Sequence, residues 1–477
     1  MSQQQTDLKK TENKSSGAET VTSPPGHLSL EGMHGSVEVP HHRSGFWQQW
    51  RAFVGPALLV SVGYMDPGNW GTDLQGGAQF KYGLLWVVGL ASLMAIFMQV
   101  ISARLGVVTG KDLAQCCRDW YPRWTRVPNW LFSEMAIGAC DLAEVLGSAV
   151  ALNLLFHIPL LWTVIITGSD VLLLLALQRF GMRTIEAVVL LLVITIAVCY
   201  FIEIFILPET HPGFLEMGGA LISPSFRQTG MIYLTIGIIG ATVMPHNLYL
   251  HSALVQSRKL QKDEESMKQA IRFNTIDSVA ALTIAFFVNA AILVLAAMVF
   301  FGKESVTVAG GAVVTFGGNA DWIRVAYLTL APLLGTAAAS TLFAVALLAS
   351  GQSSTITGTL AGQVVMEGFM HWRIKPWVRR LITRTLAILP AIFIIGLRGD
   401  GSVNDLLTLS QVVLALQLPF AMFPLLQLTS SRKRMGKWKL GWFLMIAGWG
   451  SALLITAMDV YGLPESLVAA WHVIIGK

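Results

Sequence analysis

The chain has 477 residues, of which 54% are hydrophobic and only 13% are charged. Soluble proteins carry about 25% charged residues, so this composition excludes an ordinary soluble domain and indicates a protein that crosses a membrane several times. The net charge of +5 does not point to nucleic acid, because cytoplasmic loops of membrane proteins collect Lys and Arg. The lipid bilayer is therefore the expected surrounding, and no nucleic-acid partner is expected.

The first segment, residues 1–45, is polar and lacks hydrophobic periodicity, which predicts a disordered cytoplasmic tail. An all-α membrane domain of eleven helices is predicted over 46–460, followed by a short extracellular tail at 461–477. The predicted spans are 52–80, 83–107, 130–156, 159–178, 184–206, 230–256, 274–300, 325–350, 377–397, 405–428 and 438–459.

The distribution of positive charge orients these spans. Most of the 33 Lys and Arg residues fall before the first span and in alternate connecting segments. Because such residues collect on the cytoplasmic side, the N-terminus is predicted inside and the C-terminus outside a cell membrane.

Two predicted spans are interrupted by the same four-residue pattern, x-Pro-x-Asn. The first span contains DPGNW at 66–70, and the sixth contains MPHNL at 244–248. Since five spans separate the breaks, the second five-helix unit enters the membrane in the opposite direction. This predicts an inverted repeat of 52–206 against 230–428, with 438–459 as an extra helix. Paired interrupted helices indicate the central site of a transporter, although each proline alone could be a simple kink.

The residues at the two breaks suit a metal cation. Asp66 is an ionisable group at membrane depth, and Asn69 adds a neutral oxygen. Unwound backbone frees carbonyl groups, and that of Ala241 is well placed. Met244 takes the position in the second break that Asp66 has in the first, and its soft thioether favours Mn²⁺, Fe²⁺, Co²⁺ or Cd²⁺ over Mg²⁺ and Ca²⁺. The alternative for Met244 is core packing, the usual role of Met in an apolar helix.

GYMDPGNW and ATVMPHNLYLHS together resemble the signature pair of the Nramp family of proton-coupled divalent transition-metal transporters. The resemblance covers about residues 50–460. It implies a LeuT-like fold and import of Mn²⁺, with Fe²⁺ and Cd²⁺ as further substrates, by alternating access and coupled to protons. No cofactor is expected, since the metal ion is the substrate. The metal ligands that the resemblance implies are Asp66, Asn69, Met244, the Ala241 carbonyl and Gln411 of the tenth span.

A stripe of acidic residues in the third span suggests a proton route. Glu134, Asp141 and Glu144 are spaced seven and three residues apart, so they share one helical face. Carboxylates inside a membrane must be paired, protonated or hydrated. The resemblance implies that this face carries protons together with Asp66 and the basic residues nearby. The basic partners that the sequence offers are His246 in the second break and Arg379 and Arg380 at the start of the ninth span.

The basic residues also have simpler explanations. Arg379 and Arg380 could anchor the ninth span at the cytoplasmic surface, and His251 could be a polar residue at the helix surface. His246 is the stronger candidate, because it lies within the break and His titrates near physiological pH. Arg258, which closes the sixth span, is a possible gate at the inner exit.

Of three alternative functions, the first two fit parts of the pattern. A sodium-coupled organic-solute symporter would also have an inverted repeat, but Asp66 would repel a substrate carboxylate. A divalent-cation channel would use Asp66 but would not need two broken helices. An enzyme is not indicated, because the sequence has no HExxH, P-loop or nucleophile-elbow motif. We expect a monomer whose ligands are divalent metal ions and protons.

Overall fold

The computed structural model describes residues 29–30, 33–40, 44–168, 182–206, 213–226, 230–261, 263–307, 313–315, 322–334, 337–372, 374–398 and 403–475. Within these ranges the chain is almost entirely helical. In chain order the elements are β1 (Val37–Glu38), α2 (Phe46–Phe53), α3 (Pro56–Gly63), α4 (Pro67–Phe80), α5 (Leu85–Thr109), α6 (Leu113–Trp120), η2 (Arg123–Thr125), α7 (Arg126–Phe156), α8 (Leu160–Thr167), α10 (Met182–Phe201), η3 (Ile202–Ile206), α11 (Phe214–Leu221), α12 (Met231–Val243), α13 (Pro245–Leu254), η4 (Val255–Ser257), β2 (Arg258–Lys259), α14 (Glu264–Val299), β3 (Ser305–Thr307), β4 (Val313–Thr315), α15 (Trp322–Leu334), α16 (Ala337–Met370), α17 (Pro376–Arg398), α18 (Val403–Ser430), α19 (Arg432–Met435), η6 (Gly436–Trp438) and α20 (Trp442–Ile475).

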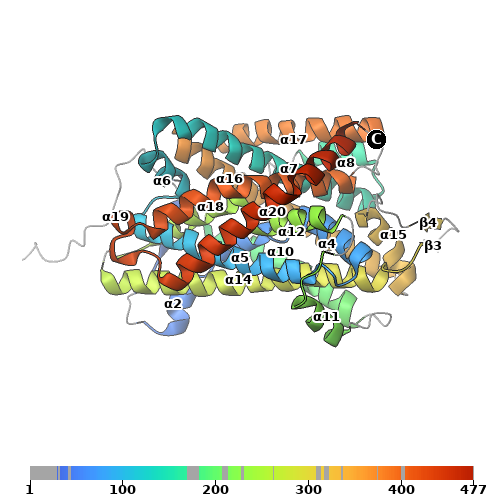
Figure 1. Ribbon diagram of the computed structural model, residues 1–477, viewed down its shortest axis with the longest axis horizontal. Coiled ribbons are helices and arrows are strands. Elements are labelled where there is room, and N and C mark those ends of the chain that lie inside the picture. The colour runs from blue at the N-terminus through green and yellow to red at the C-terminus, as the bar shows by residue number, and fades with distance from the viewer. Residues whose placement is uncertain are drawn as a thin grey trace, which may run out of the picture.

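The long helices run along the long axis of the molecule and form one bundle (Figure 1). The short helices α2, α6 and α19 lie at one end, and α11 with the β3–β4 pair lies toward the other (Figure 1). The broken helix α3–α4 is central: α4 packs against α14, α12 and α18. Half-helix α13 in turn packs against α5, α16 and α18.

Among the described residues, nine helices are long and apolar enough to cross a membrane. Two of the eleven predicted spans are missing from that set for identifiable reasons. The first span is divided by its break into α3 and α4, and each piece is too short to cross alone. The fourth span is described only over α8, because residues 169–181 lie outside the described part of the chain.

The predicted end of the eighth span, at residue 350, is wrong. The chain forms α15 and then α16, which continues to Met370. The polar run after residue 350 has the composition of a loop, but its hydroxyl groups are satisfied within the helix. Ser353 Oγ donates to the Ala349 carbonyl at 2.7 Å, and Thr359 Oγ1 donates to the Thr355 carbonyl at 2.8 Å. Side-chain bonds to the preceding turn let Ser and Thr lie in a buried helix without unpaired polar atoms.

Two other predicted ends also differ from the structure. Helix α14 begins at Glu264 rather than at 274, because the Asp263 side chain accepts from Ser266 N at 3.0 Å and caps it. Helix α20 continues through Gly462 and Pro464 to Ile475, so residues 461–475 are helical rather than an irregular tail. A Cβ at Gly462 would lie 2.0 Å from Ile236 Cδ1, so this glycine serves close packing on α12.

The prediction that 1–45 is disordered is wrong for the residues that are described there. Strand β1 pairs in parallel with β2, with Val37 opposite Arg258. Leu30 N donates to Glu367 Oε2 at 2.9 Å. Both partners come from the second half of the chain, so local composition could not reveal them. Residues 1–28 lie outside the described ranges.

The closest helix approach beside the two breaks depends on Gly240 of α12. A Cβ at this position would lie 2.0 Å from the Gln411 carbonyl oxygen and 2.7 Å from Ala415 N. Both atoms belong to the backbone of α18, which cannot move aside as a side chain would. Gly138 of α7 is the matched contrast, since nothing lies within 4 Å of a Cβ there.

We predict that Gly240→Ala lowers the thermal stability of the detergent-solubilised protein, because overpacking of a tight contact costs about 1–3 kcal/mol. Gly138→Ala should leave it unchanged or raise it slightly, since alanine costs less than glycine to fix in a helix. Melting temperatures from size-exclusion chromatography after heating would compare the two variants. Equal melting temperatures would contradict the assigned α12–α18 contact.

Candidate functional site

The first break ends α3 at Gly63 and starts α4 at Pro67. Asp66 is the N-cap of α4, and its Oδ1 accepts from Asn69 N at 2.8 Å. Proline suits the first helical position, because the N–H group that it lacks would have no intrahelical partner there. Asp66 is fully buried, and within the described structure its Oδ2 has no hydrogen-bond partner.

The second break ends α12 at Val243 and starts α13 at Pro245. Met244 joins the two half-helices with a φ of +40°, a conformation that costs energy for a residue with a side chain. Its side chain points to the first break, because a Cβ built on Gly63 would lie 3.2 Å from Met244 Sδ. The carboxylate of one repeat and the thioether of the other therefore belong to one buried site.

Three oxygen atoms from both breaks converge on the side-chain amide nitrogen of Asn69. This nitrogen lies 2.9 Å from Asp66 Oδ1, 3.0 Å from the Ala241 carbonyl oxygen and 3.4 Å from the Gly63 carbonyl oxygen. The amide group thus places its partial positive charge where a cation would be coordinated. If the Asn69 side chain turned over, its own oxygen would join the other three. The Gly63 carbonyl was not predicted from the sequence, because a backbone atom leaves no residue-type signal.

Gln411 of α18 lies against the first break. A Cβ built on Gly68 would lie only 1.9 Å from Gln411 Nε2, so the glycine makes room for this side chain. Within the described structure, the buried side-chain atoms of the two breaks and Gln411 that lack a partner include three oxygens: Asp66 Oδ2, Asn247 Oδ1 and Gln411 Oε1. An unpaired buried acceptor can be satisfied by a hydrogen-bond donor or by a cation. The arrangement therefore suits a cation better than an anion.

Outside this site, the described residues contain no group of three or more His, Cys, Asp or Glu side chains that could hold a metal ion. The candidate site is not such a group, because Asp66 is its single ionisable ligand. The remaining donors are neutral, which favours binding that can be reversed during transport.

The acidic face of α7 pairs with α17 in a ladder of buried charges. Arg379 donates to Glu134 at 2.9 Å, and Arg380 donates to both Asp141 and Glu144, the latter at 2.9 Å. Neither arginine anchors the surface, since Arg379 is 5% and Arg380 1% exposed. A third arginine, Arg384, extends the ladder, with Nη1 3.4 Å from Glu144 Oε2. Sequence reasoning missed Arg384, although its spacing of four from Arg380 places it on the same helical face.

The two histidines of α13 have different surroundings. His246 is buried in the second break, and no hydrogen bond or ion pair in the described structure joins it to the acidic ladder. His251 is also buried rather than at the helix surface, with Nδ1 2.9 Å from Gln99 Oε1. The Gln99 amide donates in turn to the Tyr64 hydroxyl at 2.7 Å, which connects α13 to α5 and the first break.

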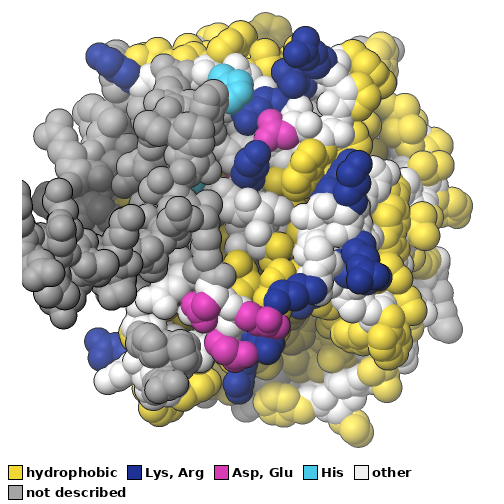
Figure 2. Space-filling model, turned by 90° about the vertical axis from the view of Figure 1, so that its left-hand side faces the viewer, with side chains coloured by type: hydrophobic (Ala, Val, Ile, Leu, Met, Phe, Trp, Pro, Cys, Tyr) yellow, Lys and Arg dark blue, Asp and Glu magenta, His cyan; other side chains and the backbone are white. Residues whose placement is uncertain are grey.

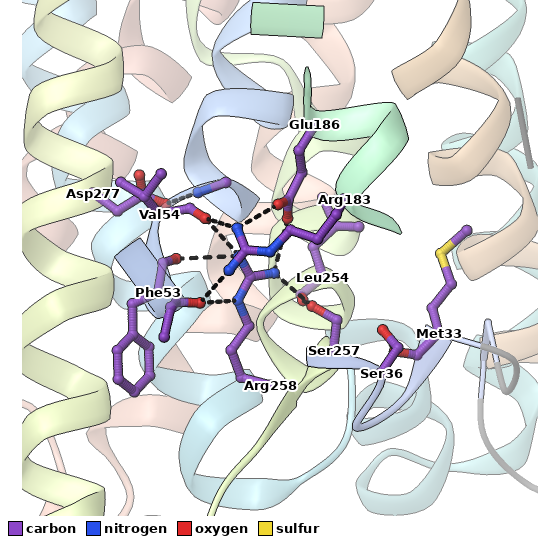
Figure 3. Close-up of polar contacts among 12 residues, drawn as sticks. Met33, Ser36, Phe53, Val54, Arg183, Glu186, Leu254, Ser257, Arg258 and Asp277 are labelled. Atoms are coloured by element: carbon purple, nitrogen blue, oxygen red, sulfur yellow. Dashed lines mark hydrogen bonds and ion pairs between the residues drawn. The ribbon is translucent and has the colours of Figure 1, made fainter. Parts of the chain in front are cut away.

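Arg258 follows α13 and η4 and lies beyond the site, toward one end of the bundle. It is 3% exposed, and its guanidinium lies between Glu186 and the backbone that joins α2 to α3 (Figure 3). Arg183 of α10 also donates to this backbone, at the Val54 carbonyl. Ala57 N, at the start of α3, donates to Asp277 Oδ2 of α14 at 2.9 Å. The acceptors of Arg258 are Glu186 Oε1 (2.9 Å), Ser257 Oγ (2.7 Å) and the carbonyls of Ala52 (3.1 Å), Phe53 (3.4 Å) and Val54 (2.6 Å).

Comparison with known proteins places this architecture in a family. The family model described as natural resistance-associated macrophage protein-like (Nramp) matches residues 57–465. A divalent metal cation transporter, MntH, of Nostoc sp. is 48% identical over 454 residues, covering 94% of this chain and 98% of its own. MntH of Listeria monocytogenes is 47% identical over 435 residues, covering 91% and 94%.

The solved structures agree. The manganese transporter of Eremococcus coleocola superposes with a TM-score of 0.82 at 39% identity, covering 93% of this chain and 92% of its own. Mhp1, a nucleobase-cation-symport-1 family transporter, superposes with a TM-score of 0.56 at 12% identity, covering 95% and 96%, and supports the LeuT-like inverted-repeat fold alone. The chain therefore belongs to the Nramp family, whose members are membrane transporters and not enzymes.

Proposed function

We propose that this protein imports divalent transition metal ions, Mn²⁺ and also Fe²⁺ and Cd²⁺, by proton-coupled alternating access. The observation that carries the proposal is the convergence of Asp66, Asn69, the Ala241 carbonyl and Met244 at two facing helix breaks. Gln411 is a further ligand in some conformations. The relatives, a divalent metal cation transporter and a manganese transporter, support the same substrate class.

The donor set selects the ion. Mg²⁺ and Ca²⁺ gain little from a thioether and favour sites rich in hard oxygen ligands. Mn²⁺, Fe²⁺ and Cd²⁺ tolerate or favour sulfur. The single carboxylate of Asp66 leaves the occupied site with a net positive charge, which aids release of the ion. An organic-solute symporter fits less well, because the carboxylate of Asp66 would repel an anionic substrate.

The inner exit opens when the contacts of Arg258 break. These contacts join the α2–α3 segment to Glu186 of α10, and Asp277 of α14 holds the same segment through Ala57 N. All of them must be exchanged for others before α3 can swing away. The Tyr64–Gln99–His251 connection lies nearer to the site and opens in the same movement. Alternating access then needs only the half-helices of the two breaks to change their contacts, as in other transporters with inverted repeats.

Protons follow the acidic face of α7. Asp66 attracts the metal as a carboxylate and carries a proton as a carboxylic acid, so metal and proton oppose each other at this group. The released proton passes by His246 to Asp141 and Glu144, and then to Glu134, with Arg379 and Arg380 holding these groups in place.

The transporter unit of 46–460 lies in the cell membrane with the N-terminus in the cytoplasm and the C-terminus outside. The end of the bundle that carries α2, α6 and α19 displays many Lys and Arg side chains and fewer acidic ones (Figure 2). Positive charge collects on the cytoplasmic side, which supports this orientation.

Met244→Ala should relax selectivity if its sulfur is a ligand. Water or another oxygen would replace the sulfur and give a harder site, so Cd²⁺ uptake should fall most and Ca²⁺ or Mg²⁺ uptake should rise. Uptake of each ion into proteoliposomes, in pairwise competition with ⁵⁴Mn²⁺, measures this change. An equal loss for all ions would leave Met244 as a packing residue.

The proton route predicts that binding and coupling separate by mutation. Asp66→Asn should nearly abolish metal uptake, because it removes the single charged ligand. Asp141→Asn and His246→Ala should retain metal binding but change proton flux and its pH dependence. Mn²⁺ uptake and internal acidification are measured together in proteoliposomes.

Asp459→Asn is the matched control for these variants. Asp459 is another buried carboxylate, on α20 and outside the proposed route, so its removal should leave the coupling of the two fluxes unchanged. The route is wrong if Asp141→Asn and His246→Ala behave as the Asp459 variant does, while the metal site would stand.

The orientation predicts opposite labelling at the two ends of α14. A cysteine at exposed Lys268 should resist impermeant thiol reagents in intact cells, and one at exposed Lys303 should react. The four native cysteines are buried and should stay silent, and their removal provides the background. Labelling at Lys268→Cys but not at Lys303→Cys would invert the topology.

A further inference from the structure

Asn247 has the same place in the second break that Asn69 has in the first. Each asparagine follows its break residue by three positions, in DPGN and MPHN. Asn69 donates to Asp66 Oδ1 through its backbone N at 2.8 Å and its side chain at 2.9 Å. Asn247 donates through its side-chain nitrogen to Met244 Sδ at 3.4 Å. In both repeats, an asparagine therefore holds the side chain that begins the half-helix.

The surroundings leave the Asn247–Met244 pair little freedom. Both side chains are fully buried. They lie together against Gly63 of the first break, where an added Cβ would be 2.4 Å from Asn247 Nδ2 and 3.2 Å from Met244 Sδ. The amide and the thioether therefore fill the space that this glycine leaves open and are in contact with each other there.

A methionine that acts as a metal ligand needs this kind of support. Its side chain has several rotatable bonds and adapts readily to different packing, so it does not by itself hold a sulfur in one direction. Fixing such a side chain in one rotamer is opposed by the loss of its rotamer freedom. A thioether sulfur has two lone pairs, of which an N–H donor engages one. The other then stays available for the ion.

We propose that Asn247 is a positioning residue that orients the Met244 thioether and thereby sets the preference of the site for soft over hard divalent ions. This inference rests on the proposed metal site. It assigns a function to a residue that lies outside the ligand set of Asp66, Asn69, Ala241, Met244 and Gln411. Because Asn247 acts through the sulfur, its removal affects Cd²⁺ more than Mn²⁺.

The test is a double-mutant cycle on metal binding. Dissociation constants for Cd²⁺ and Mn²⁺ are measured by isothermal titration calorimetry on purified protein in detergent, for the unmodified chain, Asn247→Ala, Met244→Ala and the double variant. Asn247→Ala should lower the Cd²⁺ to Mn²⁺ affinity ratio about fivefold, the effect of one neutral hydrogen bond. In the Met244→Ala background the same change should leave the ratio unaltered.

Asn247→Ser is the conservative variant, because its hydroxyl keeps a donor and should restore part of the ratio. It also serves as the test where Asn247→Ala fails to fold, again with and without Met244→Ala. A ratio that Asn247→Ala leaves unchanged would overturn the inference while the metal site stands. If Asn247→Ala also lowers the Cd²⁺ to Mn²⁺ affinity ratio in the Met244→Ala background, the inference is overturned as well, because Asn247 Oδ1 would then be a ligand itself. If the unmodified protein binds neither ion, the proposed function fails together with the inference.

Discussion

The structure depends on one constraint: a helix broken at membrane depth must have its freed backbone groups satisfied from inside the protein. Here the carbonyl of Tyr64 accepts from Asn289 of α14 at 2.8 Å, and that of Met65 accepts from Ser350 of α16 at 2.5 Å. By contrast, the carbonyls of Gly63 and Ala241 accept from the Asn69 side chain at the centre of the site. Those two oxygens are therefore the backbone groups of the breaks that face the centre of the site.

A second packing requirement explains two glycines of α16. A Cβ at Gly358 would lie 2.8 Å from Glu144 Oε1, and one at Gly362 would lie 1.9 Å from Arg379 Nη1. The helix thus leaves space for the charges of α7 and α17 to meet. Removing one partner of a buried ion pair costs about 3–5 kcal/mol, so the three carboxylates and three arginines also hold these helices in register. The ladder that is proposed to carry protons is at the same time a structural element.

The proposed metal site and the closed end of the bundle are connected through the half-helices. Tyr64, at the first break, accepts from Gln99 of α5, which meets His251 of α13. Further along, Arg258 and Asp277 hold the segment that leads into α3. In the proposed mechanism, a change at the breaks therefore shifts α3 and α13 together, because these half-helices carry the contacts proposed as the gate. Occupancy of the site and opening of the exit would then be parts of one movement.

The sequence by itself determined the broken helices, the inverted repeat and the residue types at each break, because these features depend on local signals: Pro in an apolar run, a polar side chain at membrane depth and helical spacing. It also indicated one face for Glu134, Asp141 and Glu144. Only the tertiary structure decided which distant groups meet: Arg384 with Glu144, and Val37 beside Arg258. It also decided that α16 and α20 continue through Ser, Gly and Pro, since their stability comes from helices distant in sequence. Contacts between segments hundreds of residues apart leave no periodic trace in either segment, and this is why they could not be predicted.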